Sequence, residues 1–243
     1  MSRPLGLNVR NLMSRALNWL FSILRCVRFS LRALLILFTV LALWLGWWFN
    51  RAAEQRQAAG AINAIAGQVF YDYDAPIKNT FTGSGTSRVP RWLVECLGVD
   101  SFHSVICVDL DGPQVTDASL ERLAAFPRLR HLYLGNAHVS SDGLRHLAPL
   151  ARLERVVIKS NQLDRIGLEH LARLPNLTDL EIHFSPQVTD GAITALEGAT
   201  QLRRLWLYET QVTELGVARL RRALPHCTIE CDPPRSSGLL TAN

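Results

Sequence analysis

The chain has 243 residues, five cysteines and a formal net charge of +5 at pH 7. Six arginines and no acidic residue fall within residues 1–32, whereas residues 33–243 hold 20 basic and 21 acidic side chains. The net positive charge therefore lies in the N-terminal segment. The rest of the chain has almost no net charge, which argues against a nucleic-acid-binding domain. Five cysteines are also too few for a disulfide framework.

Residues 1–32 are predicted to be a basic cytoplasmic segment. The apolar residues between its arginines could form one face of a helix at a membrane surface, and a poorly ordered basic tail is the alternative. Residues 33–49 follow as seventeen residues without a charge, ALLILFTVLALWLGWWF. As a helix this run spans roughly 26 Å, slightly less than a hydrocarbon core of about 30 Å. Flanking arginines can extend to the interfaces and make up the difference.

We therefore predict a transmembrane anchor over residues 33–50. Trp44, Trp47 and Trp48 stand at its far end, where aromatic belts lie. A cleaved signal peptide is the competing interpretation, and the length of the run and the absence of a clear small-residue cleavage site disfavour it. The flank before the run carries six arginines and the flank after it about one net positive charge. The positive-inside rule then predicts a single-pass protein with a cytoplasmic N-terminus and the rest of the chain outside the cytoplasm.

Residues 51–104 are predicted to hold a juxtamembrane helix, a strand, a linker and an N-terminal cap. An alanine-rich helix over 51–66 ends before Gly67, and residues 68–74 alternate like a strand. Residues 75–90 are rich in Gly, Ser, Thr and Pro and predict a linker. A short helix over 91–97 is expected to cover the open edge of the following repeats with Trp92, Leu93 and Leu97.

Residues 105–231 repeat one pattern of 24 or 25 residues five times, with a shortened sixth copy at the end. Each copy has two apolar residues spaced by two, as in a half-buried strand, and then an i, i+3 apolar pair on one helix face. The strand pairs are Val108/Leu110, Leu132/Leu134, Val156/Ile158, Leu180/Ile182 and Leu205/Leu207, and the helix pairs are Leu120/Leu123, Leu144/Leu147, Leu168/Leu171, Ile193/Leu196 and Val217/Leu220. Such a period predicts an α/β solenoid, in which each repeat buries its apolar face against its neighbours.

The change from strand to helix is marked by a residue type in every copy. The five residues that follow the apolar turn position are all N-cap formers: Thr116, Ser140, Asp164, Thr189 and Thr213. The next residue is acidic in three copies, which suits a helix N-terminus: Asp117, Asp190 and Glu214. Glycines recur close behind, at Gly143, Gly167, Gly191 and Gly216, and we expect a close approach between neighbouring repeats there.

The pattern LxxLxLxxTxVTDxGLxxLxxL, matched best by residues 187–196 and 210–220, resembles leucine-rich repeats of the ribonuclease-inhibitor-like and F-box-associated kind. The resemblance implies a curved parallel sheet on the concave side and helices on the convex side. The chain departs from it at the buried loop position, usually Asn or Thr, which is here Pro113, Ala137, Asn161, Ser185 and Thr210. An extra residue near Pro186 predicts a bulged loop in the fourth copy.

The order of the segments also resembles a group of bacterial membrane-anchored leucine-rich-repeat proteins. The likeness runs from about Arg28 to Ile229 and rests on the arginine-rich start, the apolar run, AINAIAGQVFYDYD and PRWLVECLGVDSFHSVICVDLDGPQVTD. It implies a topology and a fold and supplies no activity.

The end of the repeats is predicted as a last short strand. Leu224, Cys227 and Ile229 are taken to repeat the first three apolar positions, and residues 232–243 are predicted to be a flexible tail. In an oxidising compartment Cys96 could pair with Cys107, or Cys227 with Cys231.

The strand residues between the buried ones are predicted to form three columns on the concave face. They are Cys107, His131, Arg155, Asp179, Arg204 and His226; Asp109, Tyr133, Val157, Glu181, Trp206 and Thr228; and Asp111, Gly135, Lys159, His183, Tyr208 and Glu230. A catalytic interpretation would use Asp109 with His131, or Asp179 and Glu181 with His183. No activated nucleophile, phosphate-binding glycine loop or metal-ligand spacing accompanies these residues, so we predict no enzyme, no cofactor and no metal site.

A partner-binding face is the preferred interpretation, because Trp, Tyr and Arg are enriched in interface hot spots. The candidate residues are His131, Tyr133, Arg155, Lys159, Glu181, His183, Arg204, Trp206 and Tyr208. The predicted function is a single-pass membrane-anchored leucine-rich-repeat protein that presents this face to a protein or peptide outside the cytoplasm. A substrate-recognition adaptor of the F-box-associated type and a non-binding structural tether of the envelope are the alternatives.

Overall fold

The computed structural model describes residues 31–65, 67–73, 76–77, 80–81, 89–159 and 162–232. The chain forms two units, Met1–Asn50 and Arg51–Asn243. The predictions made for residues 1–30, for Asn161 and for the tail after Asp232 lie outside the described residues.

One helix, α2, covers Leu31–Ala64, beginning in the first unit and ending in the second. The predicted anchor over 33–50 and the predicted helix over 51–66 are therefore a single element. Arg32–Ala64 is long and apolar enough to cross a membrane, with a mean hydropathy of 1.9 in its most apolar window, a property that signal sequences share. The chain turns directly after the helix, where the Gly67 N–H donates to the Ile62 carbonyl at 3.0 Å. A Cβ at position 67 would lie 2.6 Å from Ile62 Cγ2, so the turn requires glycine.

The second unit is built around a seven-stranded sheet in the order β1-β4-β5-β6-β7-β8-β9. The strands are β1 (Gln68–Tyr71), β4 (Val105–Asp111), β5 (His131–Gly135), β6 (Arg155–Lys159), β7 (Asp179–Thr189), β8 (Arg204–Gln211) and β9 (Thr228–Cys231). Neighbours from β4 to β9 pair in parallel, and β1 is antiparallel to β4. A separate pair, β2 (Pro76–Ile77) and β3 (Thr80–Phe81), lies within the predicted linker.

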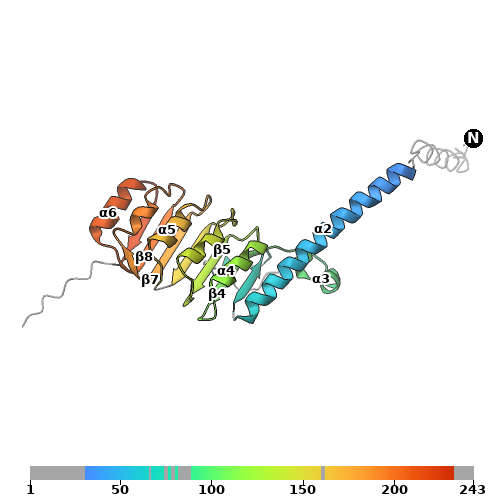
Figure 1. Cartoon of the computed structure of the whole chain (residues 1–243), viewed down its shortest axis with the longest axis horizontal. Helices are drawn as coiled ribbons and strands as arrows, with labels where there is room; N and C mark the ends of the chain where they lie inside the picture. The colour runs from blue at the N-terminus through green and yellow to red at the C-terminus, as the bar shows by residue number, and fades with distance from the viewer. Residues whose placement is uncertain are drawn as a thin grey trace, which may run out of the picture. The chain divides into compact units, whose positions relative to one another are not determined.

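Helical segments alternate with the strands and lie along one face of the sheet (Figure 1). They are α4 (Asp117–Arg122) with η2 (Leu123–Ala125), η3 (Asp142–Leu147), α5 (Arg165–Ala172), η4 (Ile193–Leu196) and α6 (Glu214–Ala223), and α3 (Arg91–Leu97) with η1 (Val99–Ser101) precedes them. The predicted mixed α/β fold, with one strand and one helix in each repeat, is confirmed. Its second and fourth helices are 3-10 turns, because the chain there makes i→i+3 hydrogen bonds.

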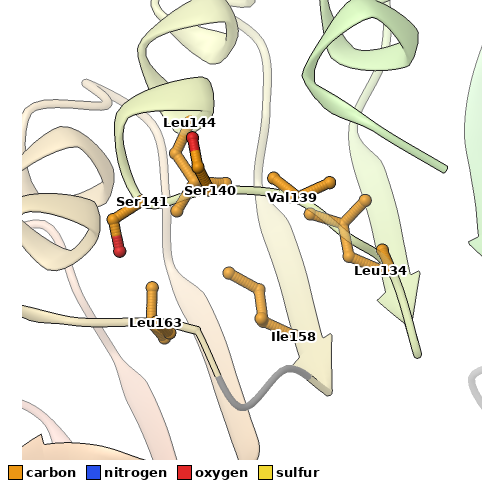
Figure 2. A pocket seen from close by; sticks show the side chains of 8 residues that line it. Leu134, Val139, Ser140, Ser141, Leu144, Ile158 and Leu163 are labelled. Atoms are coloured by element: carbon orange, nitrogen blue, oxygen red, sulfur yellow. The ribbon is translucent and has the colours of Figure 1, made fainter. Parts of the chain in front are cut away.

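The core lies between the sheet and these helices, where the sequence periodicity placed it. Every member of the predicted strand and helix pairs is at most 3% exposed. A further buried position closes the helix of each repeat and was not predicted: Phe126, Leu150, Leu174, Ala199 and Leu224. Packing leaves a void of about 10 Å³ beside Leu144, Ile158 and Leu163 (Figure 2), room for about one water molecule.

The predicted N-caps are confirmed for three helices, α4, α5 and α6, which begin after Thr116, Asp164 and Thr213. Ser140 also accepts the N–H of Gly143 at 2.9 Å, although the 3-10 turn begins at Asp142. Thr189 was wrongly predicted as a cap, because it is the last residue of β7.

At three of the four junctions between repeats, the residue after the cap position reaches forward and binds the cap residue of the next repeat, a contact we call the cap brace. Asp117 accepts hydrogen bonds from the N–H and the hydroxyl of Ser140 at 2.8 and 2.7 Å. Asp190 accepts the same two bonds from Thr213 at 2.7 and 2.6 Å. Ser141 Oγ accepts the N–H of Asp164 at 2.9 Å. The cap brace therefore links repeats one and two, two and three, and four and five.

The brace is missing between the third and fourth repeats. Arg165 occupies the position there, and a guanidinium cannot accept a hydrogen bond. Its side chain binds Glu169 within the same helix at 3.1 Å. Among the described residues no hydrogen bond joins Arg165 to Thr189, and the fourth repeat has no side-chain cap.

Two of the recurring glycines make room for the cap brace. A Cβ on Gly143 would lie 2.1 Å from Asp117 Oδ1, and one on Gly216 would lie 2.2 Å from Asp190 Oδ1. In the fourth repeat, where the brace is missing, the same position is the buried Ala192. The expected close approach is confirmed at Gly143, Gly167 and Gly216. It is wrong for Gly191, which is one residue out of register and would meet nothing nearer than 3.8 Å.

Gly143→Ala is expected to lower the free energy of unfolding by about 1–3 kcal/mol, because the new methyl group displaces the Asp117 carboxylate from Ser140. By helix propensity alone, alanine would raise the free energy of unfolding by about 1 kcal/mol. A decrease in the free energy of unfolding would therefore report the contact with Asp117 and not the helix propensity. Gly191→Ala is the matched control and should cost nothing. Chemical unfolding followed by far-UV circular dichroism measures both variants. Equal losses would show that close approach is not what requires glycine at position 143.

The N-terminal edge of the sheet is covered differently from the prediction. The helix α3 has no buried residue, and Trp92 is 64% exposed, so it does not cover the first repeat. The edge of β4 is instead paired by β1, and Ala58, Ala59 and Ile62 of α2 pack into the core. A paired strand satisfies the backbone groups of the edge, which a helix lying over it could not do.

The C-terminal strand is shifted by two residues from the prediction. Ile229 is paired with Leu205, and Cys231 with Leu207. Leu224 closes α6, the same role that Phe126 has in the first repeat, and does not begin the strand. The bulge predicted near Pro186 is confirmed by a register shift between Ser185 and Thr189 in β7.

The cysteine pairings that the sequence allows do not form in this structure. Cys96, Cys107, Cys227 and Cys231 are all free thiols.

Candidate binding face

The sheet has a second face, formed by the strand residues that alternate with the buried ones, which we call the open face. The parallel register brings His131, Arg155, Asp179 and Arg204 side by side in one column. It does the same for Tyr133, Val157, Glu181 and Trp206 in the next column, and for Lys159, His183 and Tyr208 in the third. The predicted columns are correct except at β9, where Thr228 and Glu230 stand in the places predicted for His226 and Thr228.

Two arginines on the open face are each held by a carboxylate. Arg155 binds Glu181, and both side chains are less than 20% exposed. Arg204 binds Asp179, and this hydrogen bond raises the pKa of the Arg204 guanidinium. Because each charge is paired, the arginines are fixed in place and their planes remain available for stacking.

Trp206 lies beside both guanidinium groups. Its ring centroid is 5.9 Å from the Arg155 Cζ and 5.4 Å from the Arg204 Cζ, within cation–π range. The indole N–H donates to Glu230 Oε2 at 3.1 Å, and the Tyr208 hydroxyl donates to the same oxygen at 3.3 Å. Trp206 is therefore oriented from three sides without being fully buried.

His183 extends this group toward the end of the strand. Its ring stacks on Tyr208 with the centroids 5.3 Å apart, and its Nε2 lies 3.6 Å from Glu181 Oε2. The structure thus joins six of the nine predicted residues in one connected group: Arg155, Glu181, His183, Arg204, Trp206 and Tyr208. The other three, His131, Tyr133 and Lys159, lie on β5 and β6 of the same face.

The N-terminal half of the open face is more enclosed. Burial and the nearby Asp109 raise the pKa of the Cys107 thiol to about 12. Burial, together with the neighbouring Asp111, raises the pKa of Asp109, while burial lowers the pKa of His131. A thiol with this pKa stays protonated at neutral pH, and a neutral imidazole is the expected form of His131.

The sequence analysis missed Phe184, which directly follows His183. Its ring is 53% exposed, and its backbone is left-handed with φ of 54°. The centroids of His183 and Phe184 are 6.5 Å apart, so Phe184 continues the aromatic group. A bulky aromatic at the strand-end position, where glycine or asparagine is usual, was the signal that could have identified it.

A second surface is an open groove of about 610 Å³ between the C-terminal part of α2 and the first helix of the repeats. Small side chains form much of its lining, including Ala58, Ala61, Ala124 and Ala125. Within the part of the chain that the structure describes, no group of three or more His, Cys, Asp or Glu side chains could hold a metal ion.

The chain matches no protein-family model and no curated protein. Among solved structures, it is similar to an internalin from Listeria monocytogenes, with 23% identity and a TM-score of 0.37 over 45% of this chain and 30% of that one. It is also similar to internalin C2 from the same organism, with 21% identity and a TM-score of 0.36 over 47% of this chain and 49% of that one. The chain therefore spans less than half the length of either protein, and neither match defines its function.

Proposed function

We propose that this chain is a membrane-anchored interaction protein of the leucine-rich-repeat type whose open face binds a protein or peptide. The observation that carries the proposal is the position of Trp206 and Tyr208. Both rings are only partly buried, and both are held by Glu230 at fixed orientations. Rigid aromatic side chains bury a large contact area at a low entropic cost, which favours them as anchors for a partner.

Binding is proposed rather than catalysis, because the chemistry available on the face is weak. Glu181 and Asp179 are each engaged by an arginine, so neither carboxylate is free to act on a substrate. Cys107, with a pKa of about 12, is a poor nucleophile. No cofactor or metal is part of the proposed function.

The apolar part of α2 is proposed to remain in the membrane as a single anchor. Its large apolar side chains are exposed, with Leu43 75% and Ile36 63% accessible, and lipid would cover them. Arginines are concentrated before its apolar part, which supports a cytoplasmic N-terminus and an extracytoplasmic repeat domain.

Photocrosslinking of the full-length chain in its own membrane tests the proposed face. A benzophenone side chain placed at Thr228, beside Arg204 on the open face, is expected to capture one defined partner. Trp206→Ala in the same chain should reduce that capture at least about tenfold, as expected for a hot-spot residue. Leu215→Ala on α6, where the side chain is 71% exposed, is the control and should leave capture unchanged.

A benzophenone at Arg219, on the exposed side of α6, measures capture from the helical side. The same partner captured equally from positions 219 and 228, or capture at 228 that does not depend on Trp206, would contradict the proposed face. Thermal melts of each variant separate a loss of binding from a loss of folding.

A further inference from the structure

Three non-glycine residues near the ends of the regular strand register share a left-handed backbone. Asn136 follows β5, Phe184 lies within β7 and Glu209 lies within β8, and their φ angles are 46°, 54° and 51°. Gly112, after β4, has a positive φ of 133°. Left-handed backbone brings Cβ close to the carbonyl oxygen, so glycine and asparagine adopt it most readily. The second repeat uses asparagine, one of the residues that adopt this backbone most readily.

Phe184 is not such a residue. With φ of 54°, a bulky aromatic residue is a true outlier, and its ring remains 53% exposed. Little burial offsets the strain, so the packing of this chain alone does not account for the choice of residue. Strained positions that the fold does not need are where function is expected.

The surroundings of Phe184 form one continuous surface, which we call the aromatic patch: Phe184, His183, Tyr208 and Trp206. His183 lies between Phe184 and Tyr208, with centroid separations of 6.5 and 5.3 Å. Glu230 binds the two larger rings, Tyr208 and Trp206. Phe184 is the most exposed member, and it lies at the end of the patch, shortly before the register shift in β7.

Charges around the aromatic patch are unbalanced. Five carboxylates and three cations surround it, a net charge of −2 without counting His183: Asp179, Glu181, Glu209, Glu230 and Asp232 against Lys159, Arg155 and Arg204. The two arginines are already bound by Asp179 and Glu181. Glu230 accepts its hydrogen bonds from neutral donors, and the Asp232 carboxylate accepts one from the N–H of Glu209. Lys159 stands beside His183 at the β6 side of the aromatic patch, and the carboxylates of Glu209, Glu230 and Asp232 lie at its β8 and β9 side.

We propose that Phe184 is the anchor for an extended peptide segment of a partner protein in which lysine or arginine stands next to an apolar side chain. The apolar side chain would cover Phe184, and the basic one would meet Glu209, Glu230 and Asp232. Charge complementarity selects this partner over an acidic one. The inference rests on the proposed function. It adds the class of peptide that the open face would bind and a role for Phe184 as the anchor.

The experiment uses the full-length chain in nanodiscs of phosphatidylcholine, which carry no net charge to attract basic peptides. A phage library of random twelve-residue peptides is selected on the wild-type chain, and the selected peptides are titrated against Phe184→Gly. Selected sequences are expected to be enriched in Lys or Arg beside an apolar residue. Phe184→Gly should weaken their binding at least tenfold, while its melting temperature stays the same or rises because the turn is relieved of strain.

Asn136→Gly is the matched control, since it changes the same backbone position on β5, away from the aromatic patch, and should leave peptide affinity unchanged. Peptides that depend on Trp206 but bind Phe184→Gly as tightly as wild type would overturn this inference and leave the proposed function standing. Enrichment of acidic peptides would overturn the ligand class. If no selected peptide depends on Trp206, the proposed function itself fails.

Discussion

Phe126→Ala is expected to lower the free energy of unfolding by about 3–5 kcal/mol, a large share of the roughly 5–15 kcal/mol that a domain usually has. The ring is 1% exposed and lies in the core between the first helix and the strand that follows. Phe126 also closes the connecting turn, where its N–H binds Leu123 O at 2.9 Å and its carbonyl accepts from Leu129 at 3.0 Å. Alanine would retain these backbone bonds and lose the packing.

Urea unfolding of the full-length chain measures the effect, and Leu215→Ala, on an exposed position, is the comparison that should stay within about 0.5 kcal/mol of wild type. A Phe126→Ala loss below about 1 kcal/mol would mean that neighbouring side chains close the cavity, and that this position does not help to hold consecutive repeats together.

The membrane topology gives the second prediction with a large effect. A reporter fused to Asn243 should be either active or silent, depending on the side of the membrane where it lies. A reporter that works only outside the cytoplasm is expected to give the signal, and one that works only inside it should give none. Replacing the six arginines of residues 1–32 by glutamine should abolish this preference, since the positive-inside rule depends on them.

Signal from the cytoplasmic reporter in the unmodified chain would contradict the proposed orientation and place the open face among cytosolic partners. Release of the repeat domain in soluble form would instead show cleavage after the apolar run. Fractionation of the same cells distinguishes these two results.

The repeat architecture was predictable because its signal is redundant. Strand pairs such as Leu132/Leu134 and helix pairs such as Leu168/Leu171 recur with a fixed period, so an error in one copy is corrected by the others. The ends of the array lack that redundancy. Leu224 was placed in a strand because the residue that closes each helix varies between Phe, Leu and Ala and had not been recognised as part of the pattern.

The N-terminal cap depended on contacts that no local pattern reveals. Trp92 looked like a covering residue by its size, yet Asp100 organises this end. Its side chain is 5% exposed and accepts hydrogen bonds from Gln55 and Tyr71, both at 3.0 Å. These partners are 45 and 29 residues away in the chain, beyond the reach of periodicity.

The columns of the open face were predictable from alternation, and the pairing within them was not. The strand register places Arg155 opposite Asp179, yet its side chain binds Glu181. The choice between the two carboxylates depends on the direction of the side chains, which the register does not determine. Phe184 was missed for a related reason, since the sequence shows an aromatic residue at the strand end and only the structure shows its left-handed backbone.

The interface between the third and fourth repeats lacks the cap brace that joins the other repeats, because Arg165 binds Glu169 instead. Nearest-neighbour interfaces carry the stability of a repeat array, so opening begins where one interface is weakest. Hydrogen exchange should therefore show the amides of β7, β8 and β9 gaining deuterium together, ahead of those in β4 and β5. Phe184, Tyr208 and Trp206 all belong to the part that is expected to open first. A partner that binds across these residues would stabilise the closed form of the last repeats and slow their hydrogen exchange. Ligand binding and the opening of these repeats would therefore be coupled.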